Sequence, residues 1–131
     1  MPAADDGEAR RRMPRAWRLT RSADIRALFQ RGKRSRTPHL DVFDSPSPVP
    51  HPRAGVVVPR HRQTVVRRNR LKRQLREIVR LEVLPRLERA QIQSEFLVRA
   101  RREAYEAAFA TLRDELLTWV ERRWQLDSCS P

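Results

Sequence analysis

Cysteine, glycine and long apolar runs are scarce in this sequence of 131 residues. The single cysteine, Cys129, excludes a disulfide framework and a cysteine-based metal site, and it favours a reducing compartment. With three glycines, the chain has no glycine-rich loop that could cradle a phosphate group. No apolar run is long enough to span a bilayer, and no secretion signal stands at the N-terminus. The sequence therefore predicts a cytoplasmic protein with no membrane partner.

Catalytic side chains are scarce as well. The three histidines lie in predicted loops or at strand edges, without a Cys, Ser or carboxylate spaced for a catalytic triad or a metal site; they are His39, His51 and His61. Asp41 and Asp44 are close in sequence, but three residues apart on a strand they would point to opposite faces. We therefore expect no catalytic residue, no metal ligand and no small-molecule substrate in the protein itself.

Positive charge is what the sequence has in excess. It contains 29 Lys and Arg against 16 Asp and Glu, which gives a formal net charge of +13. Residues 1–80 carry 21 basic and 7 acidic residues, whereas residues 81–131 carry 8 and 9. Such an excess indicates an anionic partner, although it says nothing about the fold. We expect the surface that binds this partner in the first two thirds of the chain.

The densest basic segment is RRNRLKRQLREIVR, residues 67–80, inside a helix predicted over 64–84 with Thr64 as its N-cap. One side of this helix is apolar and carries Leu71, Leu75 and Ile78. The opposite side is polar and carries Asn69, Arg73, Arg76 and Arg80. Arginine binds phosphate oxygens in bidentate fashion and stacks on bases, so this side suits a nucleic acid. The alternative is a solvated charged face, but such faces usually interleave more acidic residues.

The other predicted elements surround this helix. Ser22 is a candidate N-cap for a short helix that Gly32 can close, and Asp24 lies in its first turn. A half-buried strand is expected where Leu40 and Val42 alternate with polar and aromatic neighbours. The four prolines of residues 45–52 predict a loop, and Pro85 should stop or kink the basic helix after Leu84. The remaining predicted elements are strands at 53–58 and 95–101 and a helix at about 104–124, whose regularly spaced aromatics we expect in the core.

Two strands separated by a helix over residues 53–101 form a βαβ unit, so those strands are expected to be parallel. The fold class that follows is α/β (α+β), a two-layer sandwich with a small mixed sheet and helices packed on it. We expect a single RNA-binding domain over 18–125, a disordered basic arm at 1–17 and a flexible tail at 126–131. The arm either touches RNA through Arg10, Arg11 and Arg12 or has no role.

The basic helix also resembles a known family, the protein subunit of bacterial ribonuclease P. That family carries Arg-Asn-Arg, then Lys-Arg, then Arg-Glu on a central helix. The corresponding residues here are Arg68, Asn69, Arg70, Lys72, Arg73, Arg76 and Glu77. The resemblance continues back through residues 53–58 and 18–37, and forward through 96–101 and the last helix. It implies an α/β fold with a left-handed βαβ crossover, which general handedness rules disfavour.

The resemblance further implies a protein cofactor for a catalytic RNA that removes the 5′ leader from precursor tRNA. The implied partners are ribonuclease P RNA and precursor tRNA, with Mg²⁺ bound mainly by the RNA. The surface implied for the RNA subunit comprises Arg67, Arg68, Asn69, Arg70, Lys72, Arg73 and Arg76. The residues implied for the single-stranded leader are Phe29, Phe43, Arg36 and Arg60. Core packing is the alternative for both phenylalanines.

Four positions depart from the family pattern. Ile25 stands where a phenylalanine is common, and Pro59, His61 and Gln63 replace a usual serine, lysine and glycine before the basic helix. These departures place the contacts of the leader cleft and the loop in question. The alternative function is a general RNA- or DNA-binding module, or a ribosomal-protein-like domain with no enzymatic partner. A stand-alone nuclease is disfavoured because carboxylates and histidines do not cluster.

Overall fold

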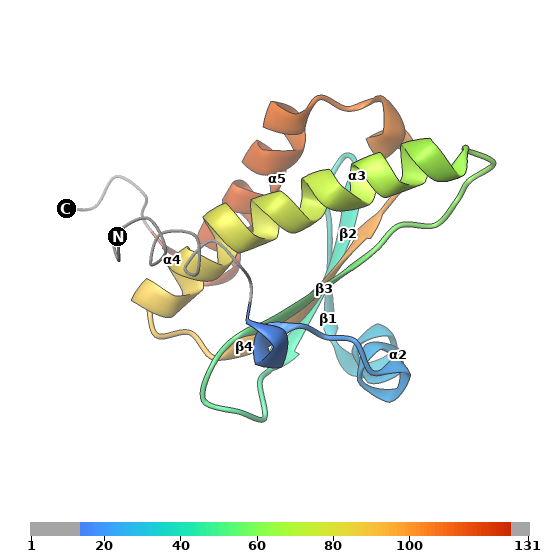
Figure 1. The fold of residues 1–131 in the computed structure, drawn as a ribbon. Helices are drawn as coiled ribbons and strands as arrows, with labels where there is room; N and C mark the ends of the chain where they lie inside the picture. The colour runs from blue at the N-terminus through green and yellow to red at the C-terminus, as the bar shows by residue number, and fades with distance from the viewer. Residues whose placement is uncertain (1–13, 127–131) are drawn as a thin grey trace, which may run out of the picture.

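The computed structural model describes residues 14–126, which form a four-stranded sheet with helices on both faces (Figure 1). The helices are α2 (Ser22–Arg31), α3 (Val65–Ile78), α4 (Leu84–Arg89) and α5 (Phe109–Arg123). The strands are β1 (Lys33–Arg36), β2 (Leu40–Pro46), β3 (Arg53–Val57) and β4 (Ser94–Ala100). Short turns of other helix types are η1 (Arg15–Trp17), η2 (Val79–Val83) and η3 (Arg102–Glu106).

The sheet has the strand order β1-β2-β4-β3. β2 pairs antiparallel with both β1 and β4, whereas β3 and β4 are adjacent and parallel. The predicted mixed sheet and its parallel βαβ pair are therefore confirmed. The left-handed sense of the crossover stays a prediction from the resemblance.

One face of the sheet packs against α3 and α5 and forms the main core (Figure 1). Alternate residues of β4 point into this core, as their spacing predicted, namely Phe96, Val98 and Ala100. The apolar stripe predicted for the basic helix is buried there as Leu71, Leu75 and Ile78. α5 contributes Leu112, Leu116, Trp119 and Val120.

The second face of the sheet is covered in part by α2 (Figure 1). Leu28 of α2 packs there with Phe43 of β2 and Leu97 of β4. β2 is therefore buried on both faces from Leu40 to Asp44, and the expectation of a half-buried strand is wrong. The predicted two-layer arrangement holds for the sheet with α3 and α5, and α2 adds partial cover on the opposite side.

The N-terminal boundary of the fold and the cap of α2 differ from the prediction. Arg15–Trp17, assigned by sequence to a disordered arm, form a turn in which the Trp17 ring stacks on His51 with centroids 5.3 Å apart. Residues 1–13 and 127–131 of the predicted arm and tail, including Arg10–Arg12 and Cys129, lie outside the described residues. Arg21 is the N-cap of α2 and Ser22 its first residue, so Ser22 is not the cap.

Of the two outcomes predicted for Pro85, a stop or a kink after Leu84, the stop is wrong, because the helical segment continues past this residue. After α3, the π turn Val79–Val83 leads directly into α4, and the N–H of Leu84 bonds to the carbonyl of Val79 five residues earlier. This wider turn resets the register, so that Pro85 falls within the first turn of α4. A proline is tolerated there because the N–H groups of a first turn have no helical partner.

The last helix begins later than predicted, at Phe109 instead of about Ala104. Tyr105 belongs to η3, and its hydroxyl donates to the carbonyl of Pro59 at 2.7 Å. Phe109 is 36% exposed, so its assignment to the core is wrong. The apolar spacing continues back through these residues, but the contact of Tyr105 with Pro59 and the burial of Ala104 favour a separate turn.

Candidate nucleic-acid interface

The loop that enters α3 is held in a strained, defined conformation. Arg60–Gln63 form a turn closed by a bond from the Gln63 N–H to the Arg60 carbonyl at 2.8 Å. Its two central residues, His61 and Arg62, have positive φ angles of 47° and 65°. Residues with a Cβ adopt this region at a cost of roughly 1–2 kcal/mol each. The turn therefore presents two basic side chains in a conformation that glycine would adopt more readily.

Two further contacts fix this loop relative to α3. The Thr64 side chain accepts a hydrogen bond from the Arg67 N–H at 3.1 Å, which confirms Thr64 as the N-cap. The Tyr105 ring lies edge-on to His61, with centroids 6.3 Å apart, and its hydroxyl binds Pro59. Burial raises the pKa of the Tyr105 hydroxyl, against the opposing effect of nearby arginines. Tyr105 thus contacts both Pro59 and His61.

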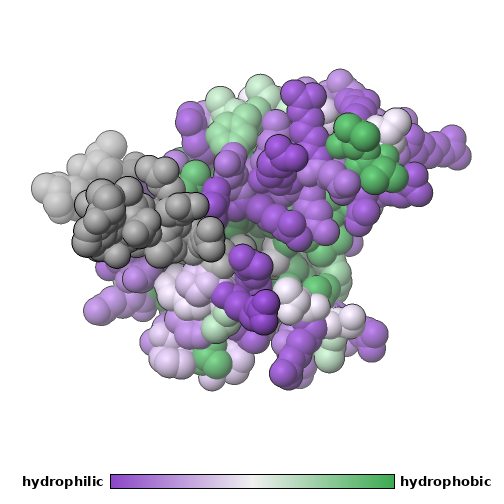
Figure 2. Space-filling view, in the orientation of Figure 1, coloured by the Kyte–Doolittle hydropathy of each residue, from purple (hydrophilic) through white to green (hydrophobic). Residues whose placement is uncertain are grey.

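The outer side of α3 carries a row of exposed polar and basic residues. Four side chains are exposed there and form no hydrogen bond or ion pair with any described residue: Asn69, Arg70, Arg73 and Arg76. Burial lowers the pKa of nearby Lys72, and the charges of Arg76 and Arg68 lower it further. In Figure 2, hydrophilic residues dominate the visible face along this helix. We call Asn69, Arg70, Lys72, Arg73 and Arg76 the basic face of α3.

Arg67 and Arg68, also predicted to contact RNA, are engaged within the protein. Arg68 Nε donates to the Val58 carbonyl at 2.8 Å and so ties the helix to the end of β3. Arg67 pairs with Glu106 at 3.0 Å, and its guanidinium lies 5.8 Å from the centre of the Tyr105 ring. These two arginines hold the first turn of α3 in place against β3 and η3.

A groove of about 380 Å³ runs beside the basic face of α3. Its floor is the edge of β3, where Leu19 N–H bonds to the Ala54 carbonyl at 2.8 Å. A Cβ at Gly55 would lie 2.8 Å from the Leu97 side chain and 3.0 Å from the Leu19 carbonyl, so a larger residue there would require the Leu97 side chain to move. The wall formed by α3 consists of Arg73, Arg76, Glu77, Val79 and Arg80. The groove next to the basic face is therefore lined by charged side chains of α3 and by apolar residues of β3.

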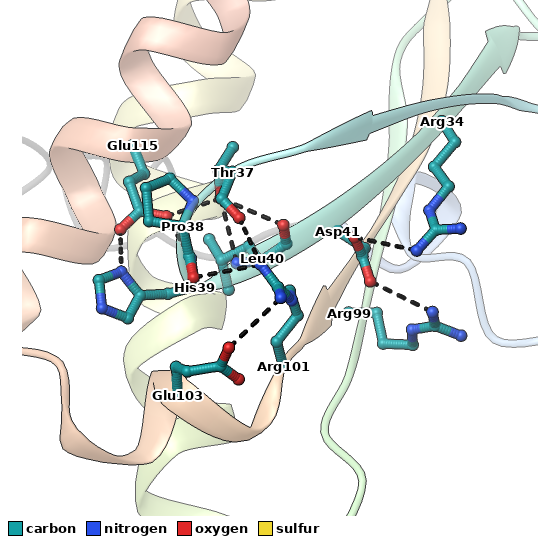
Figure 3. Close-up of polar contacts among 10 residues, drawn as sticks. All are labelled: Arg34, Thr37, Pro38, His39, Leu40, Asp41, Arg99, Arg101, Glu103 and Glu115. Atoms are coloured by element: carbon teal, nitrogen blue, oxygen red, sulfur yellow. Dashed lines mark hydrogen bonds and ion pairs between the residues drawn. The ribbon is translucent and has the colours of Figure 1, made fainter.

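A second cluster lies on the sheet face that α2 partly covers. Phe29 of α2 meets Phe43 of β2 edge-on, with centroids 5.0 Å apart. Arg99 of β4 lies 5.4 Å from both ring centres, and Arg34 of β1 lies 5.9 Å from that of Phe43. Asp41 is buried between the two guanidinium groups, 3.2 Å from Arg99 and 3.5 Å from Arg34 (Figure 3). We call Phe29, Arg34, Asp41, Phe43 and Arg99 the sheet-face cluster.

The structure brings together some of the predicted leader-binding residues. Phe29 and Phe43 are in contact, and Arg36 lies directly across from Asp41 in the pairing of β1 with β2. Arg60 lies in the turn before α3, where its charge acts on Tyr105. Phe43 is only 5% exposed and packs in the core of the free protein, in agreement with the core-packing alternative for this residue.

Sequence reasoning missed Arg34 and Arg99. The alternation of β4 places Arg99 on the face opposite Phe96, Val98 and Ala100, which is a signal the sequence does contain. The pairing that brings Asp41 to both arginines depends on the register of three strands, and local patterns do not determine that register.

Most carboxylates of the described residues form ion pairs within the fold. Asp44 accepts from Arg123 at 3.1 Å, on the face opposite Asp41, as the strand period predicted. Glu115 accepts hydrogen bonds from Thr37 and from the backbone N–H of His39 (Figure 3). Between residues 14 and 126, no three His, Cys, Asp or Glu side chains gather to hold a metal ion.

Within the same range, no helix is both long and apolar enough to cross a membrane.

Comparison with known proteins agrees with this architecture. The profile of the family described as Ribonuclease P matches residues 13–123. The chain is 40% identical over 107 residues to the ribonuclease P protein component of Acidothermus cellulolyticus, covering 79% of this chain and 84% of that protein. Its structure resembles the ribonuclease P protein of Thermotoga maritima, with a TM-score of 0.66 and 28% identity over 80% of this chain and 96% of the other.

A second solved structure supports the fold alone, because its sequence is more distant. The ribonuclease P protein of Staphylococcus aureus aligns with a TM-score of 0.69 at 20% identity, over 83% of this chain and 96% of that one. The family profile spans nearly all of the described residues, including α3 and its basic face. The chain belongs to the ribonuclease P protein family.

Proposed function

We propose that this chain is the protein subunit of a ribonuclease P ribonucleoprotein, in which a catalytic RNA removes the 5′ leader from precursor tRNA. The observation that carries the proposal is the basic face of α3, whose exposed arginines have no ion-pair partner among the described residues. A stable protein gains little from such a face alone, since like charges repel. A polyanion would offset that repulsion.

The basic face of α3 is the surface proposed for the RNA subunit. Arg70, Arg73 and Arg76 are free to form bidentate contacts with phosphates, and Asn69 can donate to phosphate or sugar oxygens. Arg67 and Arg68 keep the helix and its entry loop in register with β3 and η3. The strained turn at His61 and Arg62 lies at the start of the same surface and extends it.

The sheet-face side is the surface proposed for the leader. Arg36, Phe29 and Phe43 lie on or around this face, and Arg60 lies beyond the end of β3. A single strand needs cationic groups along its backbone and a surface that tolerates any base. Two separate surfaces on one small domain would let the protein hold both the RNA subunit and its substrate. Binding at both sites positions the leader relative to the catalytic RNA.

The hydrolytic chemistry is assigned to the RNA partner, with Mg²⁺ held there. Asp41, Asp44 and Glu115 are already engaged by arginine, threonine or histidine within the fold. The protein residues accordingly bind and orient the two RNAs.

Reconstitution tests the proposal. The protein is added to ribonuclease P RNA at a Mg²⁺ concentration where the RNA alone is slow, and cleavage of a precursor tRNA is followed. We expect faster cleavage at the same phosphodiester bond. Unchanged cleavage would contradict the proposal, and cleavage by the protein without RNA would place the chemistry in the protein. A variant with Arg70, Arg73 and Arg76 changed to alanine should lose the acceleration, whereas Arg113→Ala, on α5, should keep it.

A further inference from the structure

The sheet-face cluster presents cations to solvent and buries the Phe43 ring, while Phe29 is partly buried. The side chains of Arg34 and Arg99 are 53% and 36% exposed, whereas Phe43 is 5% exposed. Both guanidinium groups lie within 6 Å of the Phe43 ring centre, a distance typical of cation–π contacts. Phe29 contacts Phe43 from α2. A strand of nucleic acid that reached this face would meet arginines before it met a ring.

Asp41 holds these arginines in place. Its side chain is 4% exposed, its Oδ2 atom accepts a hydrogen bond from Arg99, and its Oδ1 atom lies 3.5 Å from Arg34. Oδ1 has no hydrogen-bond partner among the described residues, so this buried carboxylate depends on the two positive charges beside it. Because one anion is shared by two cations, a net positive charge remains at the surface.

The strand register adds a third cation to the same face. Residues paired across antiparallel strands point to the same side of a sheet. Asp41 pairs with Arg36 on β1 and with Arg99 on β4, and Arg34 pairs with Phe43. Arg34, Arg36 and Arg99 therefore share one face, and β1 and β4, on either side of β2, are about 10 Å apart. Three cations and one buried carboxylate exceed what a balanced structural ion-pair network would need.

We propose that Arg34 and Arg99 bind phosphates of the single-stranded 5′ leader, with Asp41 as their positioning residue. The leader then runs over the sheet-face cluster through its backbone and does not stack its bases on Phe29 or Phe43. This inference rests on the proposed function, since it concerns the leader surface of the same subunit. It assigns Arg34, Asp41 and Arg99, which the family resemblance did not.

Stacking on Phe43 would require the arginines to leave. Moving Arg99 or Arg34 away would also take a partner from the buried Asp41 carboxylate, and this loss opposes the movement. Phosphate binding needs no such rearrangement. Since Asp41 and the rings already order the two side chains, less conformational entropy is lost when a phosphate binds.

Leaders with altered chemistry separate the two modes of binding. The reconstituted holoenzyme is given precursor tRNAs whose leaders are natural, abasic with intact phosphates, or uncharged methylphosphonates with intact bases. We expect the abasic leader to keep most of the affinity that a long leader adds over a one-nucleotide leader. The methylphosphonate leader should lose that added affinity. The reverse pattern, with abasic leaders weak and methylphosphonate leaders tight, would overturn the proposal.

Variants locate the phosphate-binding side chains. Arg34→Gln and Arg99→Leu should each weaken binding of the long-leader substrate by about threefold to fivefold, as expected for a partly exposed charge pair. Each should also reduce the log–log salt slope by about 0.7 for every phosphate that is no longer neutralised. Arg113→Gln, whose side chain is 41% exposed on α5, is the matched control and should change neither quantity. Arg99→Lys keeps the positive charge and should retain the salt slope. It therefore shows whether a loss of binding in Arg99→Leu comes from the missing charge or from a folding defect.

The outcomes distinguish this inference from the proposed function. If the protein accelerates cleavage and prefers long leaders, but Arg34→Gln and Arg99→Leu leave that preference intact, only the phosphate assignment is wrong. If the protein gives no acceleration with any substrate, the proposed function itself fails. Binding of the one-nucleotide-leader substrate should be the same for wild type and both variants, because we expect so short a leader to end before the sheet-face cluster.

Discussion

The basic face of α3 and the sheet-face cluster carry the same type of side chain in two different states. On α3, Arg70, Arg73 and Arg76 extend into solvent and form no ion pair with a described residue. On the sheet, Arg34 and Arg99 are held by a buried aspartate and lie over an aromatic ring. The first arrangement leaves the full charge and the side-chain freedom available. The second arrangement reduces both the net charge and the side-chain freedom before any ligand binds.

This difference matters for binding. Free arginines give a large, salt-dependent attraction and can adapt to a structured RNA of fixed shape. Preordered arginines give a smaller attraction, at a lower entropic cost, suited to a flexible strand that brings disorder of its own. A subunit that must hold a folded RNA on one side and a flexible leader on the other has reason to use both arrangements.

The largest expected effect comes from removing the free arginines. Changing Arg70, Arg73 and Arg76 to alanine should cost about 1 kcal/mol per side chain and so weaken binding to the RNA subunit by more than about a hundredfold. Thermal unfolding of the protein alone should change little, since these residues lie off the buried stripe of α3. The matched control removes three charges elsewhere, from Arg102, Arg113 and Arg122. Equal weakening in both triple variants would mean that net charge, and not this face, governs binding.

The next effect separates Arg68 from Arg70 on the same helix. Arg68→Ala should lower the free energy of unfolding by about 1 kcal/mol, because the Val58 carbonyl loses its side-chain donor. Arg70→Ala should stay within about 0.5 kcal/mol of wild type. Urea denaturation of the free protein measures both. Equal stabilities would show that the hydrogen bond between Arg68 and Val58 contributes nothing in solution, and would return Arg68 to the set of free arginines.

The strained turn should show opposite changes in stability and binding. Arg62 has a φ of 65°, so Arg62→Gly should relieve strain and raise stability by up to about 1 kcal/mol. It should also weaken RNA binding severalfold, because a positive charge at the entrance to α3 is removed. Arg62→Asn tolerates the same conformation and separates the charge from the strain. If Arg62→Gly binds as tightly as wild type, the turn lies outside the interface.

The sequence predicts most of the fold because apolar periodicity is local. The stripe of Leu71, Leu75 and Ile78 and the parallel pairing of β3 with β4 are confirmed. The continuation of the helix through Pro85 and the late start of α5 were missed, since a π turn and a tyrosine hydroxyl bond to a distant loop decide them.

The two candidate surfaces also differ in how far local sequence patterns predict them. The basic face of α3 can be read along one helix, so its residues were named from the sequence. The sheet-face cluster needs three strands in register, with Asp41 and Arg99 separated by 58 positions, and no local pattern encodes that meeting.

The smallest effect tests whether Asp41 creates the difference between the two surfaces. Asp41→Asn keeps the shape of the side chain but removes the negative charge that Arg34 and Arg99 share, so the sheet face should come to resemble the basic face of α3. Each arginine is then free to neutralise a phosphate of its own. The log–log salt slope for long-leader binding should therefore rise by about 0.7, the value for one additional phosphate neutralised on a single strand. Binding at low salt should tighten and binding at high salt should weaken, because charge increases while order decreases. Titration of holoenzyme with precursor tRNA over a range of salt concentrations measures the slope. An unchanged slope with uniformly weaker binding would mean that Asp41 acts only through the packing of β2, and that the two surfaces differ for another reason.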